Sequence, residues 1–527
     1  MAEQATAKPT AQSAAPNSPL ATRAGPNESA LKQAYTAERT TLASTVAATS
    51  MTTGLSQTTN IEAKERVEGA RTKLIAAATV MASIALIATI LVLVNANSSG
   101  DTTTADTELT YRELTTASTE ATTAARTHRK ATTTEAGTTA VQTTEKKRGL
   151  DARTLLCTYG DATNSSTVFP PDGLCDLIFF DSAYKGYKNV PLIQGSFEDN
   201  IKVFLSAAQG YQNTEFGVAF AYKYHTWMRN DLKKADSKLL EVFWSSGVFH
   251  FGVIDMPAFG VDPRNISDAL TTLKELSAVA MKRPDPLRQP YSVLGAATAD
   301  MAGSYASKLR AVYTPTLFIS QGHYAFGDNE LPDCKMVPPT MLQKPAASQG
   351  YTYDLTDALS ALQLSQDAGV PSKWLVSVTM KGRLTVAKNE TFQLLSDCKN
   401  DAYAKSFGTY VEVCTSSFFR KKLKYFDSLE AAYTVNVFKK TMFVYDNEKG
   451  LCTKMCRLKS QNDNLQFGIA VFDLDYEDYN NSCTDLNVFG AFSRLKMVRK
   501  LVDYFRTPSA SGARCESDVP CPKGAAN

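Results

Sequence analysis

The chain has 527 residues, more than one ordinary hydrophobic core organises, so two or more regions are expected. Its formal net charge of +3 points neither to a nucleic-acid binder nor to a partner of a polyacid. All ten cysteines lie at or after Cys157. An even number confined to one part of a chain is typical of disulfides formed in the secretory pathway, whereas reduced cytosolic thiols are the alternative.

The first structured element that we expect is a membrane-spanning helix. Leu74 to Val94 form a run without a charge or a proline. At about 1.5 Å per residue, a helix of this length crosses the roughly 30 Å hydrocarbon layer. Four basic residues lie just before the run, and no Lys or Arg follows it before Arg112. The positive side stays in the cytosol, so the sequence predicts a type II signal-anchor with the C-terminal part outside the cell.

The segments on either side of this helix are poor in large apolar side chains. Residues 1–73 are expected to be a disordered cytoplasmic tail. Residues 95–150 are dominated by threonine and are typical of a glycosylated extracellular stalk. The basic residues 146–148 could form a shedding site, with a charged linker as the alternative. Four Asn-X-Ser/Thr sequons follow in the folded part: Asn164, Asn265, Asn389 and Asn480.

Residues 151–506 alternate short apolar runs with longer amphipathic stretches. The runs are nearly continuous in apolar residues, which is typical of strands buried on both faces. They are 154–160, 176–181, 215–222, 249–256, 291–298, 316–322, 374–380 and 467–475. Strands that alternate with helices predict a parallel sheet, and eight of them favour an α/β fold of the (β/α)8 TIM-barrel type. A doubly wound open sheet is the alternative. Residues 507–527 are expected to be a tail in which Cys515 and Cys521 close a small loop.

Five segments in order resemble glycoside hydrolase family 18, the chitinases and chitinase-like proteins. They are Cys157 followed by FPPDGLCDLIFF, GVPSKWLVSVTMKGR (369–383), YVEVC (410–414), FVYDNEKG (443–450) and FGIAVFDLDYEDYNNSC (467–483). The resemblance implies a TIM barrel with a small α+β insertion at about 384–450. It also implies the disulfides Cys157–Cys175 and Cys414–Cys483.

Active members of that family carry several Asp and then a Glu at the end of the fourth strand, and the Glu protonates the glycosidic oxygen. The matching segment here is FHFGVIDMPA (249–258). Asp255 falls at the position of the Asp that positions the substrate's N-acetyl group, and Pro257 falls at the position of the acid. No Glu occurs from residue 242 to 274. We therefore expect a catalytically inactive homologue.

Other residues that shape the family's sugar site also differ. Phe472 stands at the place of a Trp in strand eight, and Lys381 at the place of a Tyr in strand seven. Gln321 and His323 stand where strand six normally carries Met-X-Tyr-Asp. Together with Asp255, these residues are candidate contacts for a glycan or protein bound at the barrel mouth. The alternative is a hydrolase of amino-sugar polymers with relocated catalytic groups, but the sequence alone does not assemble a second carboxylate in the mouth.

The remaining candidate sites are less specific. The four His show no metal-ligand spacing, and we expect no metal and no cofactor. The acidic turn at 473–478 is expected to be solvated, with a cation site as the alternative. The basic run FFRKKLKYF (418–426) is interpreted as one helix face, with a patch for an acidic glycan as the alternative. The partners of Cys334, Cys398, Cys452 and Cys456 stay open.

Overall fold

The computed structural model describes residues 149–523, apart from 259, 284–288, 299–300, 325–333, 346–352, 390, 400–405 and 421–422. All of them belong to one compact unit, Gly137–Asn527. The predicted cytoplasmic tail, the apolar run Leu74–Val94, nearly all of the stalk and the basic residues 146–148 lie outside the described residues. Within the described part, no helix combines the length and the apolar character that crossing a membrane requires.

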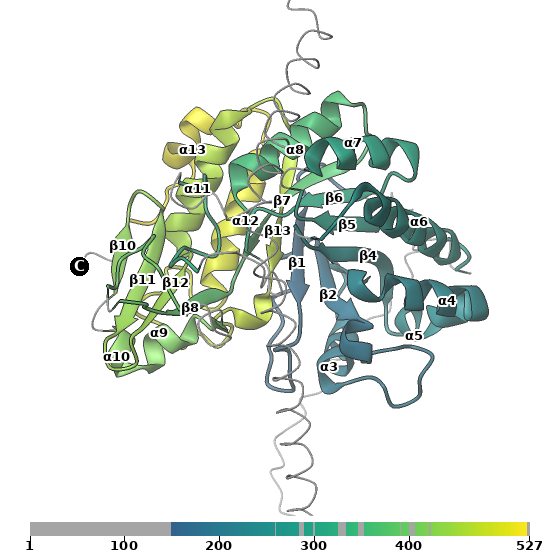
Figure 1. Cartoon of the computed structure of the whole chain (residues 1–527), viewed down its shortest axis with the longest axis horizontal. Helices are drawn as coiled ribbons and strands as arrows, with labels where there is room; N and C mark the ends of the chain where they lie inside the picture. The colour runs from purple at the N-terminus through teal and green to yellow at the C-terminus, as the bar shows by residue number, and fades with distance from the viewer. Residues whose placement is uncertain are drawn as a thin grey trace, which may run out of the picture. The chain divides into compact units, whose positions relative to one another are not determined.

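Eight parallel strands close into a barrel, in the order β1-β13-β7-β6-β5-β4-β3-β2 (Figure 1). The predicted barrel is therefore confirmed, and the open-sheet alternative is wrong. Almost every residue of these strands is buried, because side chains fill the barrel on one face and pack under helices on the other. The strands are β1 (Leu155–Tyr159), β2 (Leu177–Ala183), β3 (Glu215–Phe220), β4 (Val248–Met256), β5 (Ser292–Ala296), β6 (Leu317–Ser320), β7 (Lys373–Thr379) and β13 (Phe467–Phe472).

The inside of the barrel is filled by an apolar cluster that includes Phe179, Ile254 and Phe472. Gly217 on β3 faces the Phe179 ring, and a Cβ at this position would lie only 2.4 Å from a ring carbon. A glycine on β3 therefore gives the large ring of β2 room to occupy the centre.

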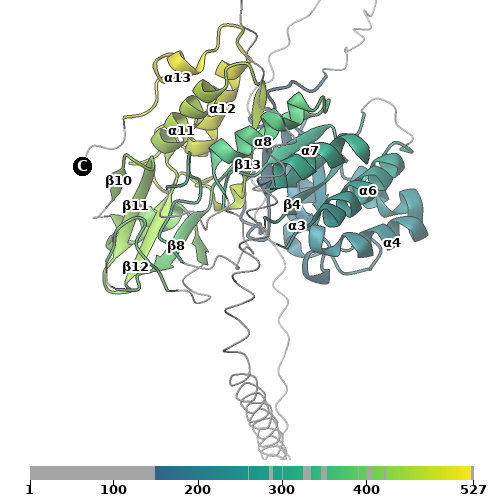
Figure 2. The ribbon, with the colours of Figure 1, turned by 45° about the horizontal axis from the view of Figure 1, so that its top comes forward.

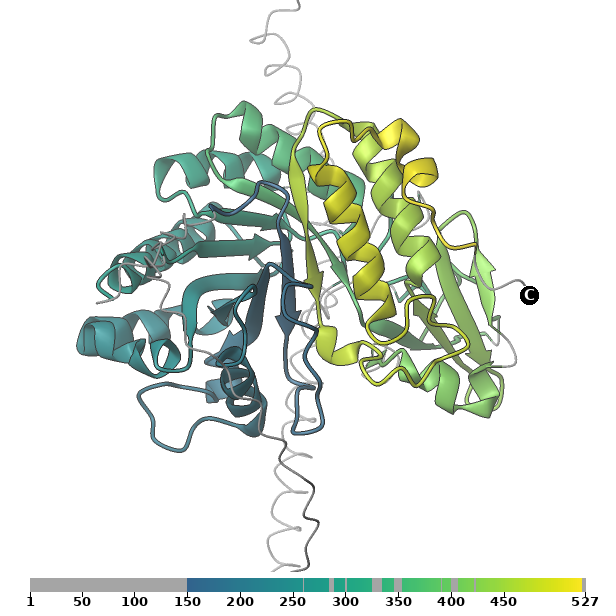
Figure 3. The same cartoon turned by 180° about the vertical axis from the view of Figure 1, so that it is seen from behind.

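Helices surround the barrel and bury its outer face. The α6 helix begins at a capping box, in which the Asp262 carboxylate accepts from two backbone N–H groups and the Asn265 side chain accepts from the Asp262 N–H. Figure 3 shows α11 and α12 side by side on the far face. The helices are α3 (Asp199–Ala208), α4 (His225–Ala235), α5 (Glu241–Trp244), α6 (Pro263–Ala280), α7 (Ala302–Ala311), α8 (Leu355–Asp367), α11 (Glu448–Gln461), α12 (Ser493–Arg506) and α13 (Gly512–Asp518). Short 3-10 turns are η1 (Lys185–Tyr187), η2 (Tyr222–Tyr224), η3 (Asp236–Leu239) and η7 (Leu474–Tyr476).

A second, antiparallel sheet lies beside the barrel, between β7 and α11 in the chain (Figure 2). Its strands, in spatial order, are β10 (Lys424–Phe426), β11 (Ala431–Asn436), β12 (Thr441–Tyr445), β8 (Gly382–Val386) and β9 (Ser406–Gly408). Two short helices precede β10, α9 (Val411–Thr415) and α10 (Ser417–Arg420). The basic run was interpreted as one helix face, which is wrong: it begins in α10 and ends in strand β10.

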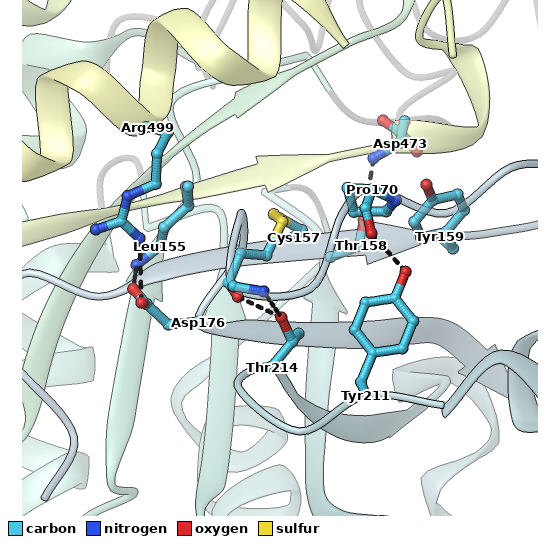
Figure 4. Close-up of a disulfide and its surroundings, with 12 residues drawn as sticks. Leu155, Cys157, Thr158, Tyr159, Pro170, Asp176, Tyr211, Thr214, Asp473 and Arg499 are labelled. Atoms are coloured by element: carbon cyan, nitrogen blue, oxygen red, sulfur yellow. Dashed lines mark hydrogen bonds and ion pairs between the residues drawn. A yellow bond between two sulfur atoms is a disulfide. The ribbon is translucent and has the colours of Figure 1, made fainter. Parts of the chain in front are cut away.

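The Cys157–Cys175 disulfide joins β1 to the segment before β2 (Figure 4). Close to it, the Asp176 carboxylate accepts the Leu155 N–H at 2.7 Å and pairs with Arg499 of α12 at 3.1 Å. These contacts fasten the first two strands and the last barrel helix to one another. Cys414–Cys483, the second pair that the resemblance implied, is also present.

The C-terminal cysteines do not close a loop with each other, so that prediction is wrong. Cys452 bonds Cys521, and Cys456 bonds Cys515. The two α11 cysteines lie one helical turn apart and hold α13 against α11. The last pair is Cys334–Cys398.

Candidate functional site

Two irregularities in the barrel strands define its carboxyl-terminal mouth. The β2–β3 register shifts between Phe180 and Ala183, and the β4–β5 register shifts between Val253 and Met256. In each case one strand carries an extra residue, which is a β-bulge. Asp181 lies within the first bulge and Asp255 within the second, on the two strands that flank β3.

The β4 bulge changes which side chains face the mouth. Ile254 belongs to the cluster inside the barrel, whereas Met256 packs on the helix side, where its sulfur accepts the Tyr305 hydroxyl at 3.9 Å. Between them, an Asp255 carboxylate oxygen accepts the Tyr222 N–H, just beyond β3, at 2.8 Å. Pro257 follows the strand and is partly buried. It has no proton to donate at this end of the strand.

Asp255 has a perturbed ionisation. Burial, together with the nearby charge of Asp181, raises the pKa of the Asp255 carboxyl to about 7. Burial also raises the pKa of Asp181, even though Lys185 opposes this shift. Asp181 Oδ1 is buried and accepts no hydrogen bond from the described residues. A carboxyl that holds a proton near neutral pH, beside a second carboxyl, is a common property of functional sites.

Asp181 is a residue that the sequence analysis missed. From the sequence alone we could not assemble a second carboxylate in the mouth. The structure supplies one, because Asp181 on β2 is close enough to Asp255 to shift its pKa. The signal was present in the sequence. Asp181 ends the apolar run DLIFFD, and an acid at the carboxyl end of a barrel strand faces the side that carries active sites.

His323 and Phe472 form the floor of the mouth next to β6 and β13. Their ring centroids lie 4.6 Å apart, and His323 Nδ1 lies 2.6 Å from the Ser377 hydroxyl. Burial lowers the pKa of His323 to about 4, so the ring is neutral at physiological pH. Gln321 is buried and donates from its amide to the Ile254 carbonyl at 2.7 Å. Gln321 therefore braces the β4 bulge, and its amide nitrogen is already engaged.

Lys381 closes this floor on the side of the second sheet. Its ammonium lies 2.7 Å from Asp473 Oδ1 and within 5.4 Å of the ring centroids of Phe407 and Tyr476. Asp473 also accepts the Thr379 hydroxyl at 2.6 Å. Burial alone would raise the pKa of Asp473, but the Lys381 charge outweighs it and lowers that pKa. The mouth therefore holds a fixed ion pair on one side and a protonatable carboxyl pair on the other.

The acidic turn that follows β13 is buried, so the prediction of a solvated turn is wrong. Each carboxylate has a partner within the chain. Asp475 accepts the Gly160 and Ala162 N–H groups, Glu477 pairs with Arg494 at 2.6 Å, and Asp478 accepts N–H groups of the following loop. These contacts account for the turn as a structural element.

Three aromatic rings, of which two are exposed, form a platform at the rim of the mouth. Tyr187, just after β2, lies 4.3 Å from the Trp227 ring and 4.8 Å from the Tyr224 ring, measured between centroids. Tyr187 is 59% exposed and Trp227 is 47% exposed. Exposed rings grouped in this way can pack against the apolar face of a sugar. We call these three residues the aromatic platform. The sequence does not single out these residues by a periodic apolar pattern, because they lie in a loop and at the beginning of a helix.

Within the described residues, only one group of three metal-type ligands has its ligand atoms close together, namely Cys452, Cys456 and Cys521. All three are in disulfides, so they offer no thiolate. His225 and His250 are engaged elsewhere: His225 stacks on Tyr222, and His250 pairs with Glu215 at 2.9 Å.

No protein-family model matches the chain, and no curated protein matches it either. Solved structures that are similar in fold are chitinases and chitinase-like proteins. The second catalytic domain of a group II chitinase from Ostrinia furnacalis is 11% identical with a TM-score of 0.50, and the match covers 67% of this chain and 97% of that one. Human YKL-39, a pseudo-chitinase that retains chitooligosaccharide binding, is 14% identical with a TM-score of 0.48, over 66% of this chain and 99% of that one.

The cell-surface chitinase ChiW from Paenibacillus sp. is 15% identical with a TM-score of 0.49. The match covers 67% of this chain but only 33% of that much longer one. At such identities the similarity shows the fold alone, a closed barrel of the chitinase type.

Proposed function

We propose that this chain is a chitinase-like protein of the cell surface that binds a glycan in its barrel mouth without cleaving it. The observation that carries the proposal is the end of β4. The neighbours of Asp255 along the chain are Ile254, which fills the barrel interior, Met256, which packs outward, and Pro257. No Glu occurs from residue 242 to 274, so this strand end offers no carboxyl beyond Asp255.

The aromatic platform supports binding of a sugar rather than of an ion or a nucleotide. Tyr187 follows β2, which carries Asp181, and Tyr224 and Trp227 follow Tyr222, whose N–H is donated to Asp255. Ring faces that pack on a pyranose, next to carboxylates that accept its hydroxyl groups, are the contacts a neutral saccharide needs. A chitooligosaccharide is the ligand class that we propose first.

For the cellular location, we propose the arrangement that the sequence predicts. The apolar run Leu74–Val94 anchors the chain, residues 1–73 stay in the cytosol, and the threonine-rich stalk presents the barrel outside. Cleavage at residues 146–148 would release it. Five disulfides in the described part support an oxidising compartment.

One observation favours a second candidate, a hydrolase with relocated catalytic groups. Because the pKa of Asp255 is about 7, this carboxyl retains a proton near neutral pH and can act as a general acid, with the Asp181 carboxyl as its neighbour. Glycosidases commonly use two carboxyl groups at one site.

One experiment separates the two functions. The full-length protein is titrated with chitohexaose by calorimetry, and the same mixture is analysed for shorter products. Binding without products supports the binding protein. Products that disappear in Asp255→Asn but persist in Asp172→Asn, an acid on the opposite end of the barrel strands, would establish the hydrolase instead. If the protein neither binds chitohexaose nor yields shorter products, both proposed functions are wrong.

A further inference from the structure

A pocket lies away from the barrel mouth, where the antiparallel sheet meets α11 and the C-terminal segment. The space inside it is about 50 Å³, so it receives one group of a ligand whose remainder lies at the open rim. Its wall is formed by β10, β12, the first turn of α11, the loop after Cys483 and the residues after Cys521. None of these segments belongs to the barrel mouth as the structure describes it.

Two disulfides hold the walls of this pocket in place. Cys414–Cys483 anchors the loop that carries Leu486, and Cys452–Cys521 fixes Lys523 next to the first turn of α11. A site whose loops are already ordered loses little conformational entropy on binding. The pocket is therefore preorganised.

One oxygen of a buried carboxylate in this pocket has no hydrogen-bond partner. Glu448 is 3% exposed, and its Oε1 accepts no hydrogen bond in the described structure. An oxygen left unpaired in this way loses its hydration without a replacement, which destabilises the fold. A ligand hydroxyl or N–H group that donated to it would offset this loss. Glu448 lies beside the Tyr410 and Tyr445 rings, which burial keeps un-ionised by raising their pKa values.

The rim of the pocket carries the opposite charge. Lys424 and Lys523 are exposed, and neither pairs with a carboxylate among the described residues. Lys449 lies 3.7 Å from the centroid of the Tyr425 ring and 3.2 Å from Asp427 Oδ1, so its charge is partly satisfied. The ammonium groups of Lys424 and Lys523, together with the unpaired oxygen of Glu448, suit a ligand that bears both an anionic group and hydroxyl donors.

We propose that this pocket binds an acidic sugar residue at the end of a glycan. Its carboxylate or sulfate would meet Lys424 and Lys523, its hydroxyl groups would donate to Glu448, and its apolar face would pack on Tyr425. The site is independent of the barrel mouth and of the function proposed for it. It also agrees with the alternative interpretation of the basic run 418–426.

The test uses the full-length protein and three probes: 3′-sialyllactose, neutral lactose and inorganic sulfate. We expect 3′-sialyllactose to bind at least tenfold more tightly than the other two, because only this probe satisfies both the lysines and Glu448. The double variant Lys424→Gln/Lys523→Gln should weaken its binding at least tenfold. The control Lys439→Gln/Lys238→Gln makes the same change in net charge at exposed positions outside the pocket, and it should leave the affinity unchanged.

Any one of four results would overturn the proposal. The first is that 3′-sialyllactose does not bind, the second that lactose binds equally well, and the third that sulfate alone binds equally tightly. The fourth is that the control variant loses as much affinity as the pocket variant. Equal binding of sulfate would mean that the sugar and Glu448 play no part. Equal loss in the control would mean that only the overall charge attracts the probe.

Discussion

The Lys381 ammonium lies 2.7 Å from the Asp473 carboxylate, and both side chains are more than 85% buried. The resemblance to family 18 places a Tyr at the position of Lys381, in the wall of the sugar site. Here that position carries a charge that is neutralised by the turn after β13. The pair therefore neutralises the charge of Lys381 inside the mouth.

Removal of one partner of this pair should destabilise the fold. Lys381→Met leaves the Asp473 charge buried, and we expect a loss of about 3 kcal/mol or more in the free energy of unfolding, measured by urea denaturation. Lys381→Met/Asp473→Asn should regain most of the loss, because the charge is gone and the Asn amide can still accept from Thr379. Asn also tolerates the left-handed backbone of position 473 (φ 65°). A double variant as unstable as the single one would contradict this account.

Asp255 should make stability depend on pH in a defined direction. Its pKa in the folded state, about 7, lies above that of an unfolded Asp, near 4. Between these values the unfolded state releases its proton first, so this group lowers the free energy of unfolding as the pH rises from about 4 to about 7. Asp255→Asn removes the effect. The variant should gain stability over the wild type across this window, by about 1 kcal/mol or more, and keep the gain above pH 7.

The control for this experiment is Asp172→Asn. Although slight burial opposes it, backbone N–H donors of Gln212, Asn213 and Thr214 lower the pKa of Asp172. The Asp172 carboxylate stabilises the fold at every pH above the pKa of an unfolded Asp, so Asp172→Asn should lower the free energy of unfolding in that range. Asp255→Asn should raise it, so the two variants should change stability in opposite directions. Equal pH profiles for Asp255→Asn and the wild type would exclude the raised pKa.

The sequence predicted the barrel because its eight strands are buried on both faces and read as continuous apolar runs. It did not predict the β4 bulge, because a regular alternation of side chains from Val253 to Pro257 was assumed, and one extra residue changes which of them face inward. Asp181 was missed for a related reason, since it lies in the bulge of β2. The pairing of Cys515 with Cys456 depends on how α13 returns to α11, which no local pattern encodes.

The aromatic platform should contribute to glycan affinity without contributing to the fold. Trp227 is 47% exposed, so Trp227→Ala should leave the midpoint of urea unfolding nearly unchanged. Loss of a ring that packs on a sugar should weaken chitohexaose binding about tenfold, as measured by calorimetry. Phe438→Ala is the matched control, because Phe438 is 84% exposed and lies in the turn between β11 and β12, in the second sheet. Unchanged affinity in Trp227→Ala would place the glycan elsewhere.

The four sequons differ in how accessible their asparagines are. Asn164, Asn389 and Asn480 are exposed on loops. Asn265 is only partly exposed, lies in the first turn of α6, and uses its side-chain oxygen to accept the Asp262 N–H at 2.9 Å. Glycosylation of Asn265 would place a bulky group on a residue of the capping box.

A chain whose barrel lies outside the cell should carry N-linked glycans at the three exposed sites and none at Asn265. The full-length protein made in a secretory host is treated with an N-glycosidase, and its mass is compared with that of single Asn→Gln variants. Asn164→Gln, Asn389→Gln and Asn480→Gln should each remove one glycan, whereas Asn265→Gln should remove none and instead lower stability by about 1 kcal/mol through the lost cap. A protein without any glycan would contradict the orientation predicted from the charges around Leu74–Val94, since glycans are added only to segments that enter the secretory pathway. A glycan at Asn265 alone would mean that accessibility in the folded state does not govern the choice of site.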